Sequence, residues 1–288
     1  MTATTGRQAP DWSTVQLPDT WPDQLNLLKP QDLWLFARHA LGLDRRPVQL
    51  PDGVLGMDHI PKYILQEFHN LPNGNYSRRF TRGYITGFNR VMLGEISKSH
   101  TLIAQQLAAQ PDIKNGTVLD IGCGGGGLAG ALQQAGIAEV WGLDPSPYLL
   151  KHAAHDWPCV HFVQGIAEET GFADAQFNAI TACFLLHEIP PRYLQQCFSE
   201  WARILQPGGL LAFCEPSPLQ LTASPLALWR SYGWRGVYFR YLARCVYEPF
   251  LTAWHQQDIT ALLSQHGFEL VSHDLGVPMR HVLARKRG

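Results

Sequence analysis

The fold of this chain is decided by the stretch TVLDIGCGGGGL, residues 117–128. Its first part, Thr117–Ile121, has branched apolar residues and predicts a short buried strand with Asp120 near its carboxyl end. A run of glycines interrupted by Cys123 follows, and the apolar-periodic segment LAGALQQAG predicts a helix from Leu128. A strand, a glycine turn and a helix N-terminus form the place where open α/β sheets bind nucleotide-like ligands.

The glycine turn distinguishes between such ligands. Its spacing, Gly122-x-Gly124-x-Gly126, also fits the start of a dinucleotide-binding fingerprint. However, Asp120 stands two residues before the first glycine, where its carboxylate would repel a pyrophosphate, and no Gly-Lys-Ser/Thr follows as in a P-loop. A ligand with a ribose and a positive charge fits better, and S-adenosylmethionine (SAM) has a sulfonium, an ammonium and no phosphate.

The same stretch, Asp120-x-Gly122-x-Gly124-x-Gly126, resembles motif I of the class I SAM-dependent methyltransferases. The resemblance assigns its acid and its loop, including Cys123, to cofactor binding, and it extends from about Leu107 to the C-terminus. It implies an α/β fold: a Rossmann-like three-layer sandwich with a seven-stranded, mostly parallel sheet whose last strand is antiparallel. We expect residues 96–288 to form this SAM-binding domain and residues 1–95 to form a helical N-terminal extension or cap.

Two further stretches resemble the adenosine-binding part of the family. Glu139–Asp144 reads as a strand ending in an acid, followed by Pro145, and it resembles the ribose-binding position. Asp144 would equally suit a Rossmann-type reductase. The third stretch is Val160–Glu168. The family usually has Asp after its glycine, here Gly165, to bind the adenine amino group, whereas this chain has Ile166. We therefore expect the backbone amide of Ile166 or Ala167 to contact the adenine.

The fourth stretch, Phe177–Pro190, predicts a buried strand and a turn at Cys183 and Phe184 beside the cofactor. It lacks the Asn- or Asp-Pro-Pro-aromatic motif of enzymes that methylate amino groups of bases. Instead, Leu186-His187-Glu188 resembles the corresponding run of small-molecule methyltransferases. His187 is either a general base, since its ordinary pKa is near neutrality, or a hydrogen-bonded structural residue.

The fifth stretch, Leu205–Pro216, predicts a glycine turn and an apolar strand that ends at Glu215. This carboxylate would either orient the acceptor or bond to His187. The chain then ends with a helix over Gln256–His266 and two strands, Phe268–His273 and His281–Ala284, as in the closing hairpin of the family.

The N-terminal part predicts helices over Gln31–Leu43, Ile60–Phe68 and Ser99–Gln110, the last capped by Ser97 or Ser99. Between them, the aromatic and basic segment from residue 76 to 100 would form one aromatic stripe if it is helical. The stripe contains Tyr76, Phe80, Tyr84 and Phe88. It either packs into the core or covers the active site, in which case Tyr76 and Tyr84 are candidate catalytic residues.

Residues 217–254 form an aromatic-rich insertion after the predicted fifth strand. They hold nine of the 31 aromatic residues of the chain together with four arginines. The insertion could be a lid over a hydrophobic or aromatic acceptor, a docking surface, a peripheral membrane contact or ordinary helix packing.

The composition restricts the remaining properties. The net charge is −1, which provides no general attraction for nucleic acid. There is neither a signal-like apolar segment at the N-terminus nor an apolar run of about 20 residues, so we expect a cytoplasmic protein without a transmembrane segment. The cysteines form no CxxC pair, and His152, His155, Cys159 and His161 are assigned to a solvated face, so no metal site is expected.

Together, these patterns predict methyl transfer from SAM to a small, hydrophobic or aromatic acceptor, with His187, Glu215, Tyr76 and Tyr84 as candidates for deprotonating it. The attacked atom, O, S, N or C, and the oligomeric state stay open. The alternatives are an NAD(P)-dependent oxidoreductase, a non-catalytic SAM-binding partner subunit, and RNA methylation through the basic segment near residue 80. RNA methylation would require steeply salt-dependent RNA binding.

Overall fold

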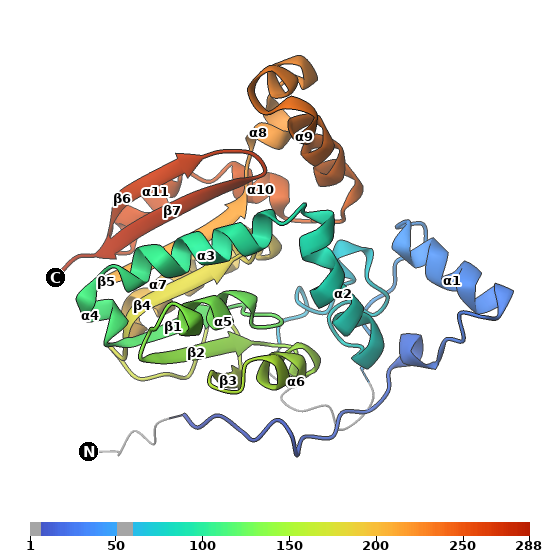
Figure 1. Cartoon of the computed structure of the whole chain (residues 1–288), viewed down its shortest axis with the longest axis horizontal. Coiled ribbons are helices and arrows are strands. Elements are labelled where there is room, and N and C mark those ends of the chain that lie inside the picture. Colours follow the sequence, from blue (N-terminus) through green and yellow to red (C-terminus); the bar gives the residue numbers. More distant parts are fainter. Residues whose placement is uncertain (1–6, 51–59) are drawn as a thin grey trace.

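The computed structural model, which describes residues 7–50 and 60–288, has a central seven-stranded sheet (Figure 1). The strand order is β3-β2-β1-β4-β5-β7-β6, and β7 is antiparallel to both of its neighbours while the other pairs are parallel. The predicted sheet is therefore confirmed. The strands are β1 (Thr117–Ile121), β2 (Glu139–Asp144), β3 (His161–Gln164), β4 (Phe177–Cys183), β5 (Leu205–Pro216), β6 (Phe268–Leu275) and β7 (Met279–Lys286).

The central strand β1 shows why the sheet is covered on both faces. Its residues alternate between two apolar clusters: Leu119 and Ile121 belong to one, and Val118 to the other. Helices cover each cluster, as expected for parallel strands with apolar residues on both sides. One face has α3 (Glu95–Ala108), α4 (Pro111–Lys114), α5 (Gly127–Gln134) and α6 (Pro147–Asp156), and the other has α7 (Pro191–Ile204) and α11 (Ile259–Gln265). These are the three layers of the sandwich.

The N-terminal part lies beside the carboxyl ends of the parallel strands, with α2 next to the sheet edge and α1 further out (Figure 1). Its elements are η1 (Trp21–Gln24), α1 (Pro30–Ala40), η3 (Phe68–Asn70) and α2 (Arg78–Val91). The helix α2 begins because the Ser77 hydroxyl accepts a hydrogen bond from the Phe80 backbone amide at 3.0 Å. It ends at Val91, shortly before Leu93 and Gly94, which both have positive φ. The boundary at residues 95 and 96 between an extension and the main domain stays a prediction, and residues 51–59 of that extension lie outside the described part.

The insertion after β5 is helical. It contains α8 (Leu219–Thr222), α9 (Pro225–Cys245) and α10 (Leu251–His255), and α9 projects beyond the sheet (Figure 1). Gly233, with φ 63° and ψ −153°, divides α9 into two helical parts. In the described residues, no helix is both long enough and apolar enough to cross a membrane.

Several predicted helix boundaries are wrong. The helix predicted over Ile60–Phe68 does not form: residues 60–67 are turns, bends and irregular backbone, and only the short η3 begins at Phe68. His69 and Asn70 in η3 have left-handed backbone conformations (φ 57° for each). The helix predicted from Ser99 begins earlier, at Glu95, because Gly94 at φ 80° provides its N-cap.

Two further boundaries differ from the prediction. Tyr76 precedes α2, so it is not on the same helix as the other three rings of the predicted stripe. The helix predicted from Gln256 begins at Ile259, where the Asp258 side chain accepts from the Ala261 amide.

Candidate active site

A cavity of about 350 Å³ lies at the carboxyl ends of β1, β2 and β4, where their residues share an edge. Nine of the predicted cofactor-binding residues line it. They are Gly122, Cys123, Gly124, Asp144, Pro145, Ile166, Ala167, Cys183 and Phe184. The two others, Asp120 and Gly126, do not.

The glycine loop leaves room for a ligand. Gly124 has φ 52°, and a Cβ added there would meet no atom within 4 Å, so its backbone faces open space in the cavity. Gly122 has φ 67°, and its added Cβ would come within 2.8 Å of the Leu185 side chain. A larger residue at Gly122 would therefore collide with the Leu185 side chain, and one at Gly124 would have a strained left-handed backbone and fill part of the cavity.

Asp144 holds the loop and faces the cavity. Its Oδ2 accepts from the Gly124 amide at 2.9 Å, and its Oδ1 accepts from the Ser146 amide at 2.8 Å. Each carboxylate oxygen has a second acceptor position, so the pair can also accept from two ribose hydroxyls. Burial raises the pKa of Asp144 to about 6.

Asp120 instead supports the loop from behind. It is 2% exposed and accepts from the Thr181 hydroxyl of β4 at 2.9 Å and from the Ala129 amide of α5. Burial raises its pKa to about 7. It therefore connects β1 to β4 and to the helix after the glycine loop rather than facing the cavity.

The loop after β3 forms the opposite wall, with Ile166 and Ala167 lining the cavity. The Ala167 carbonyl accepts from Trp201 Nε1 at 3.1 Å, and Arg7 donates to the Gln164 and Thr170 carbonyls on either side of the loop. The wall is thus held in place by α7 and by the N-terminal segment.

A second cavity, of about 400 Å³, lies between α1, α2 and α9. It has mainly apolar lining, including Phe80 and Gly87 of α2 and Phe239 and Leu242 of α9. The two cavities share a wall of four residues, which are His69, Tyr84, Phe88 and Phe184. Phe184 has φ 57°, a strained conformation for this residue type of the kind that clusters at functional sites.

The four predicted catalytic residues lie at different depths. Tyr84 lines both cavities, and burial, followed by the charges of Glu188 and Glu248, raises its pKa well above the usual value. Tyr76 lines only the first cavity, where burial and then Asp144 raise its pKa. Its position is therefore on the ribose side.

His187 and Glu215 are fully buried and line neither cavity. The Glu215 carboxylate accepts from His187 Nδ1 at 2.6 Å and from the backbone amides of Leu185, Leu186 and His187. Burial lowers the pKa of His187, but Glu215 and then Glu248 outweigh this effect and raise it well above the usual value. Of the two predicted roles for Glu215, the structure thus shows the bond to His187.

Sequence reasoning missed two residues of this region, His69 and Glu248. His69 Nε2 lies 2.9 Å from Glu248 Oε1 and 3.2 Å from Glu188 Oε1. The two side chains come from the N-terminal extension and from the insertion, and no local motif marks either of them.

Comparisons with known proteins agree with this fold. Residues 118–209 match the family described as a methyltransferase domain. An uncharacterized methyltransferase of Synechocystis sp. is 35% identical over 188 residues, which are 64% of this chain and 79% of that protein. A demethylmenaquinone methyltransferase of Chlorobaculum parvum is 35% identical over 99 residues, 34% of this chain and 40% of that protein, so this match spans less than half of the relative.

Among solved structures, magnesium protoporphyrin IX methyltransferase from Synechocystis with bound S-adenosylhomocysteine (SAH) has the same fold. The TM-score is 0.52 at 19% identity, with 71% of this chain and 97% of that chain covered. The chain belongs to the class I SAM-dependent methyltransferases. It is an enzyme with SAM as its cofactor, which excludes the oxidoreductase and non-catalytic alternatives.

The residues of the first cavity fit SAM. Asp144 has free acceptor positions for the ribose, the loop at Gly124 leaves space beside the backbone, and no phosphate-binding group is needed. When bound, SAM supplies an electrophilic methyl group on a sulfonium.

Proposed function

We propose that this enzyme methylates a small apolar molecule that binds in the second cavity. The observation that supports the proposal is the wall shared by the two cavities, since a methyl donor in one and an acceptor in the other would meet there. Holding two reactants in line can contribute about 7–11 kcal/mol to catalysis. Positioning is therefore the main task of the residues around the wall.

The lining of the second cavity supports an apolar acceptor. Gly83 and Gly87 lie one turn apart on α2 and line this cavity, and an added Cβ at either would meet nothing within 4 Å. Glycine costs about 1 kcal/mol relative to alanine in a helix interior. Its presence at both positions is explained if the space is occupied by a ligand.

Two aromatic side chains would position the acceptor. The Tyr84 hydroxyl would donate a hydrogen bond to a polar group of the acceptor, and Phe88 and Phe184, whose ring centroids are 6.0 Å apart, would enclose the reacting end. His187 and Glu215 would act indirectly, by fixing the turn after β4 that contains Phe184. Tyr76 would contribute to cofactor binding.

The acceptor class that we favour is a quinol or phenol with an apolar substituent. One relative is named a demethylmenaquinone methyltransferase, and a quinone gains ring hydroxyl groups when it is reduced to the quinol. Ring stacking and apolar contact are the interactions that this lining offers.

The proposal is tested by measuring SAH formation with quinols, phenols, thiols and amines, each with and without an apolar substituent. We expect turnover to be highest with substituted quinols or phenols, and kcat/KM to rise with the apolar substituent. Equal turnover of small polar acceptors would contradict it.

We further propose that α9 contacts a lipid surface from which the acceptor enters. Its exposed side chains include Leu226, Trp229, Trp234 and Tyr241, which are 56–67% exposed, together with the exposed Arg230 and Arg244. Aromatic residues and arginines on one helix favour the interface of a membrane with anionic lipids. The same helix lines the second cavity, so the lipid surface would lie next to its entrance.

A further inference from the structure

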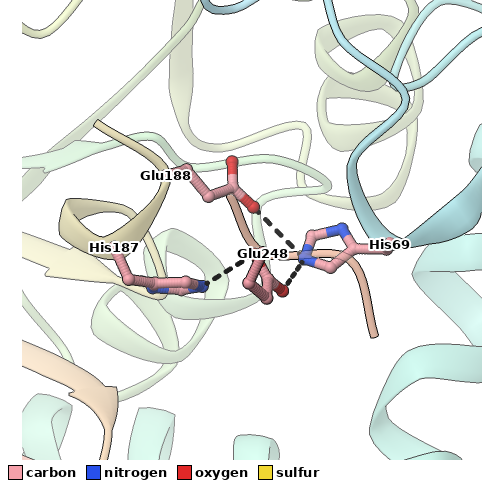
Figure 2. A group of neighbouring side chains, drawn as sticks. All are labelled: His69, His187, Glu188 and Glu248. Carbon is pink, nitrogen blue, oxygen red and sulfur yellow. Dashed lines mark ion pairs between the residues drawn. The ribbon is translucent and has the colours of Figure 1, made fainter. Parts of the chain in front are cut away.

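The structure brings together four possible metal ligands at the wall between the two cavities. His69 is in η3, His187 and Glu188 are in η4 (Leu186–Glu188), and Glu248 precedes α10. One nitrogen or oxygen atom from each side chain lies within 4.8 Å of the others. Figure 2 shows the four side chains near one another, with His187 and Glu188 on one segment and His69 and Glu248 on two others.

We propose that these four residues bind a divalent transition-metal ion. Two imidazole nitrogens and two carboxylates are a donor set that suits Zn²⁺, Mn²⁺ or Fe²⁺, whereas Mg²⁺ and Ca²⁺ prefer oxygen ligands alone. A tetrahedral ion with bonds of about 2.1 Å holds its ligand atoms about 3.4 Å apart. The observed distances of 2.9 Å, 3.2 Å and 3.5 Å between nitrogens and oxygens of the cluster are close to that value.

The second shell also resembles that of a metal site. The Nδ1 of His187 bonds to Glu215 at 2.6 Å, which directs its Nε2 toward Glu248. Metal-binding histidines almost always have such a partner on the other ring nitrogen. The His69 ring is held differently, stacked on Tyr84 with centroids 5.2 Å apart and an angle of 14° between the planes.

Unsatisfied atoms inside the cluster point to a missing partner. His187 Nε2 and Glu248 Oε2 are buried and form no hydrogen bond in the described part of the chain, although they face each other at 3.5 Å. The His187 side chain is 0% exposed and that of Glu248 is 10% exposed. An ion between them would satisfy both atoms, since buried polar groups without partners are costly.

The charge of the cluster agrees with a divalent ion. Glu188, Glu215 and Glu248 place three carboxylates around two imidazoles with at most 18% side-chain exposure. Buried carboxylates need a compensating positive charge. One divalent ion bound by neutral imidazoles supplies the same charge as two imidazolium groups and satisfies all four ligands.

The backbone at His69 is a further indication. This residue has φ 57° and ψ 19°, inside a turn that places its ring in the cluster and in both cavity walls. Non-glycine residues held in this region cluster at functional sites. The ion would thus join the N-terminal extension, the turn after β4 and the insertion, next to where the acceptor meets the methyl donor.

The experiment measures metal binding without SAM or acceptor, so its outcome does not depend on the proposed function. Tag-free protein is analysed for metal content, stripped with chelator, and titrated with Zn²⁺, Mn²⁺ and Mg²⁺ by calorimetry. We expect about one Zn²⁺ or Mn²⁺ per chain, a higher melting temperature with the ion, and binding of Mg²⁺ that is at least about 100-fold weaker.

Variants distinguish the proposed metal ligands from residues that do not bind the ion. We expect His69→Ala and Glu248→Gln each to weaken Zn²⁺ binding at least about 100-fold, and Glu215→Gln to weaken it about 10- to 100-fold through the second shell. His155→Ala, at a side chain that is 81% exposed, is the matched control and should bind as the wild type. Circular dichroism checks folding, and Co²⁺ absorption reports the ligands of any variant that stays folded.

Two results would overturn the proposal. One is wild-type protein that binds none of the transition ions at a 1:1 ratio. The other is folded His69→Ala and Glu248→Gln proteins that bind Zn²⁺ as tightly as the control does. In either case, the cluster would be a buried network of ion pairs.

Discussion

Asp144 connects the glycine loop, the turn after β2 and the cofactor cavity. Burial raises its pKa to about 6, and we propose that its ionised form accepts hydrogen bonds from the two ribose hydroxyls of SAM. We therefore predict that SAM affinity is constant above pH 6 and falls about tenfold per pH unit below it. Two other titratable groups face Asp144: Asp120, with a pKa of about 7, and Tyr76, with a raised pKa. Both are present in the wild type and in the Asp144→Asn variant described next.

Calorimetry of the wild type and of Asp144→Asn between pH 5 and 8 tests this prediction. The variant should bind SAM more weakly at pH 7 and lose the pH dependence centred near 6. An unchanged pH profile in Asp144→Asn would assign the titration to another group.

Asp120 has a structural role, so we expect its substitution to change the free energy of unfolding. Asp120→Ala leaves the Thr181 hydroxyl and the Ala129 amide without their buried acceptor. Each unsatisfied donor costs about 1–3 kcal/mol, so we predict a loss of at least about 2 kcal/mol in the free energy of unfolding. Urea denaturation measures it, and a variant as stable as the wild type would show that the two bonds contribute little.

Among the helices, α2 is the one that would keep space open for the proposed acceptor, since Gly83 and Gly87 line the second cavity. We predict that Gly87→Ala stabilises the protein by about 0.5–1 kcal/mol because glycine is unfavourable in a helix. Gly87→Leu should fill the second cavity and lower kcat/KM for the acceptor at least about tenfold, with the Kd for SAM unchanged.

Thr86→Leu is the matched control for this change. Thr86 is the exposed neighbour on the same helix and lines neither cavity, so the added bulk enters solvent. Equal activity of Gly87→Leu and Thr86→Leu would show that the acceptor binds elsewhere.

The helix α9 provides the second prediction at this scale. Replacing both Trp229 and Trp234 with serine removes exposed apolar side chains. This change should lower partition onto vesicles containing phosphatidylglycerol at least about tenfold. Val271→Ser changes a similarly exposed apolar residue on β6 and serves as the control. Vesicle co-sedimentation measures the effect, and equal partition of both variants would argue against a membrane contact of α9.

For the molecule as a whole, the sequence predicts the strands of the central sheet better than the N-terminal extension. β1 and β2 have the predicted bounds, and β4 begins at Phe177 as predicted, because their apolar residues are local, contiguous and buried on both faces. The helix predicted over residues 60–68 does not form because its apolar residues pack in different directions: Phe68 lines the first cavity, while Leu65 packs with Leu17 and Tyr148. Such tertiary packing overrides helical periodicity.

In the candidate site, too, residues of local motifs are predictable and residues brought together by tertiary packing are not. Residues within one motif, such as Gly124 and Asp144, are recognisable from spacing, and nine of the predicted set line the first cavity. His69 and Glu248 come from segments that meet only in the folded chain, so no pattern in the sequence brings them to His187. The shared wall between the cavities likewise depends on how α2 and α9 pack.

In the proposed function, methyl transfer takes place across the wall shared by the two cavities, to an apolar acceptor. The most direct measurement is mass spectrometry of a mixed pool of quinols, phenols, thiols and amines, with and without apolar substituents, after incubation with SAM carrying a deuterated methyl group. We predict that the label appears first in apolar quinols or phenols and that Gly87→Leu lowers its incorporation at least about tenfold without loss of SAM binding. Label confined to small polar acceptors, or product unaffected by Gly87→Leu, would show that methyl transfer does not take place across this wall to an apolar acceptor.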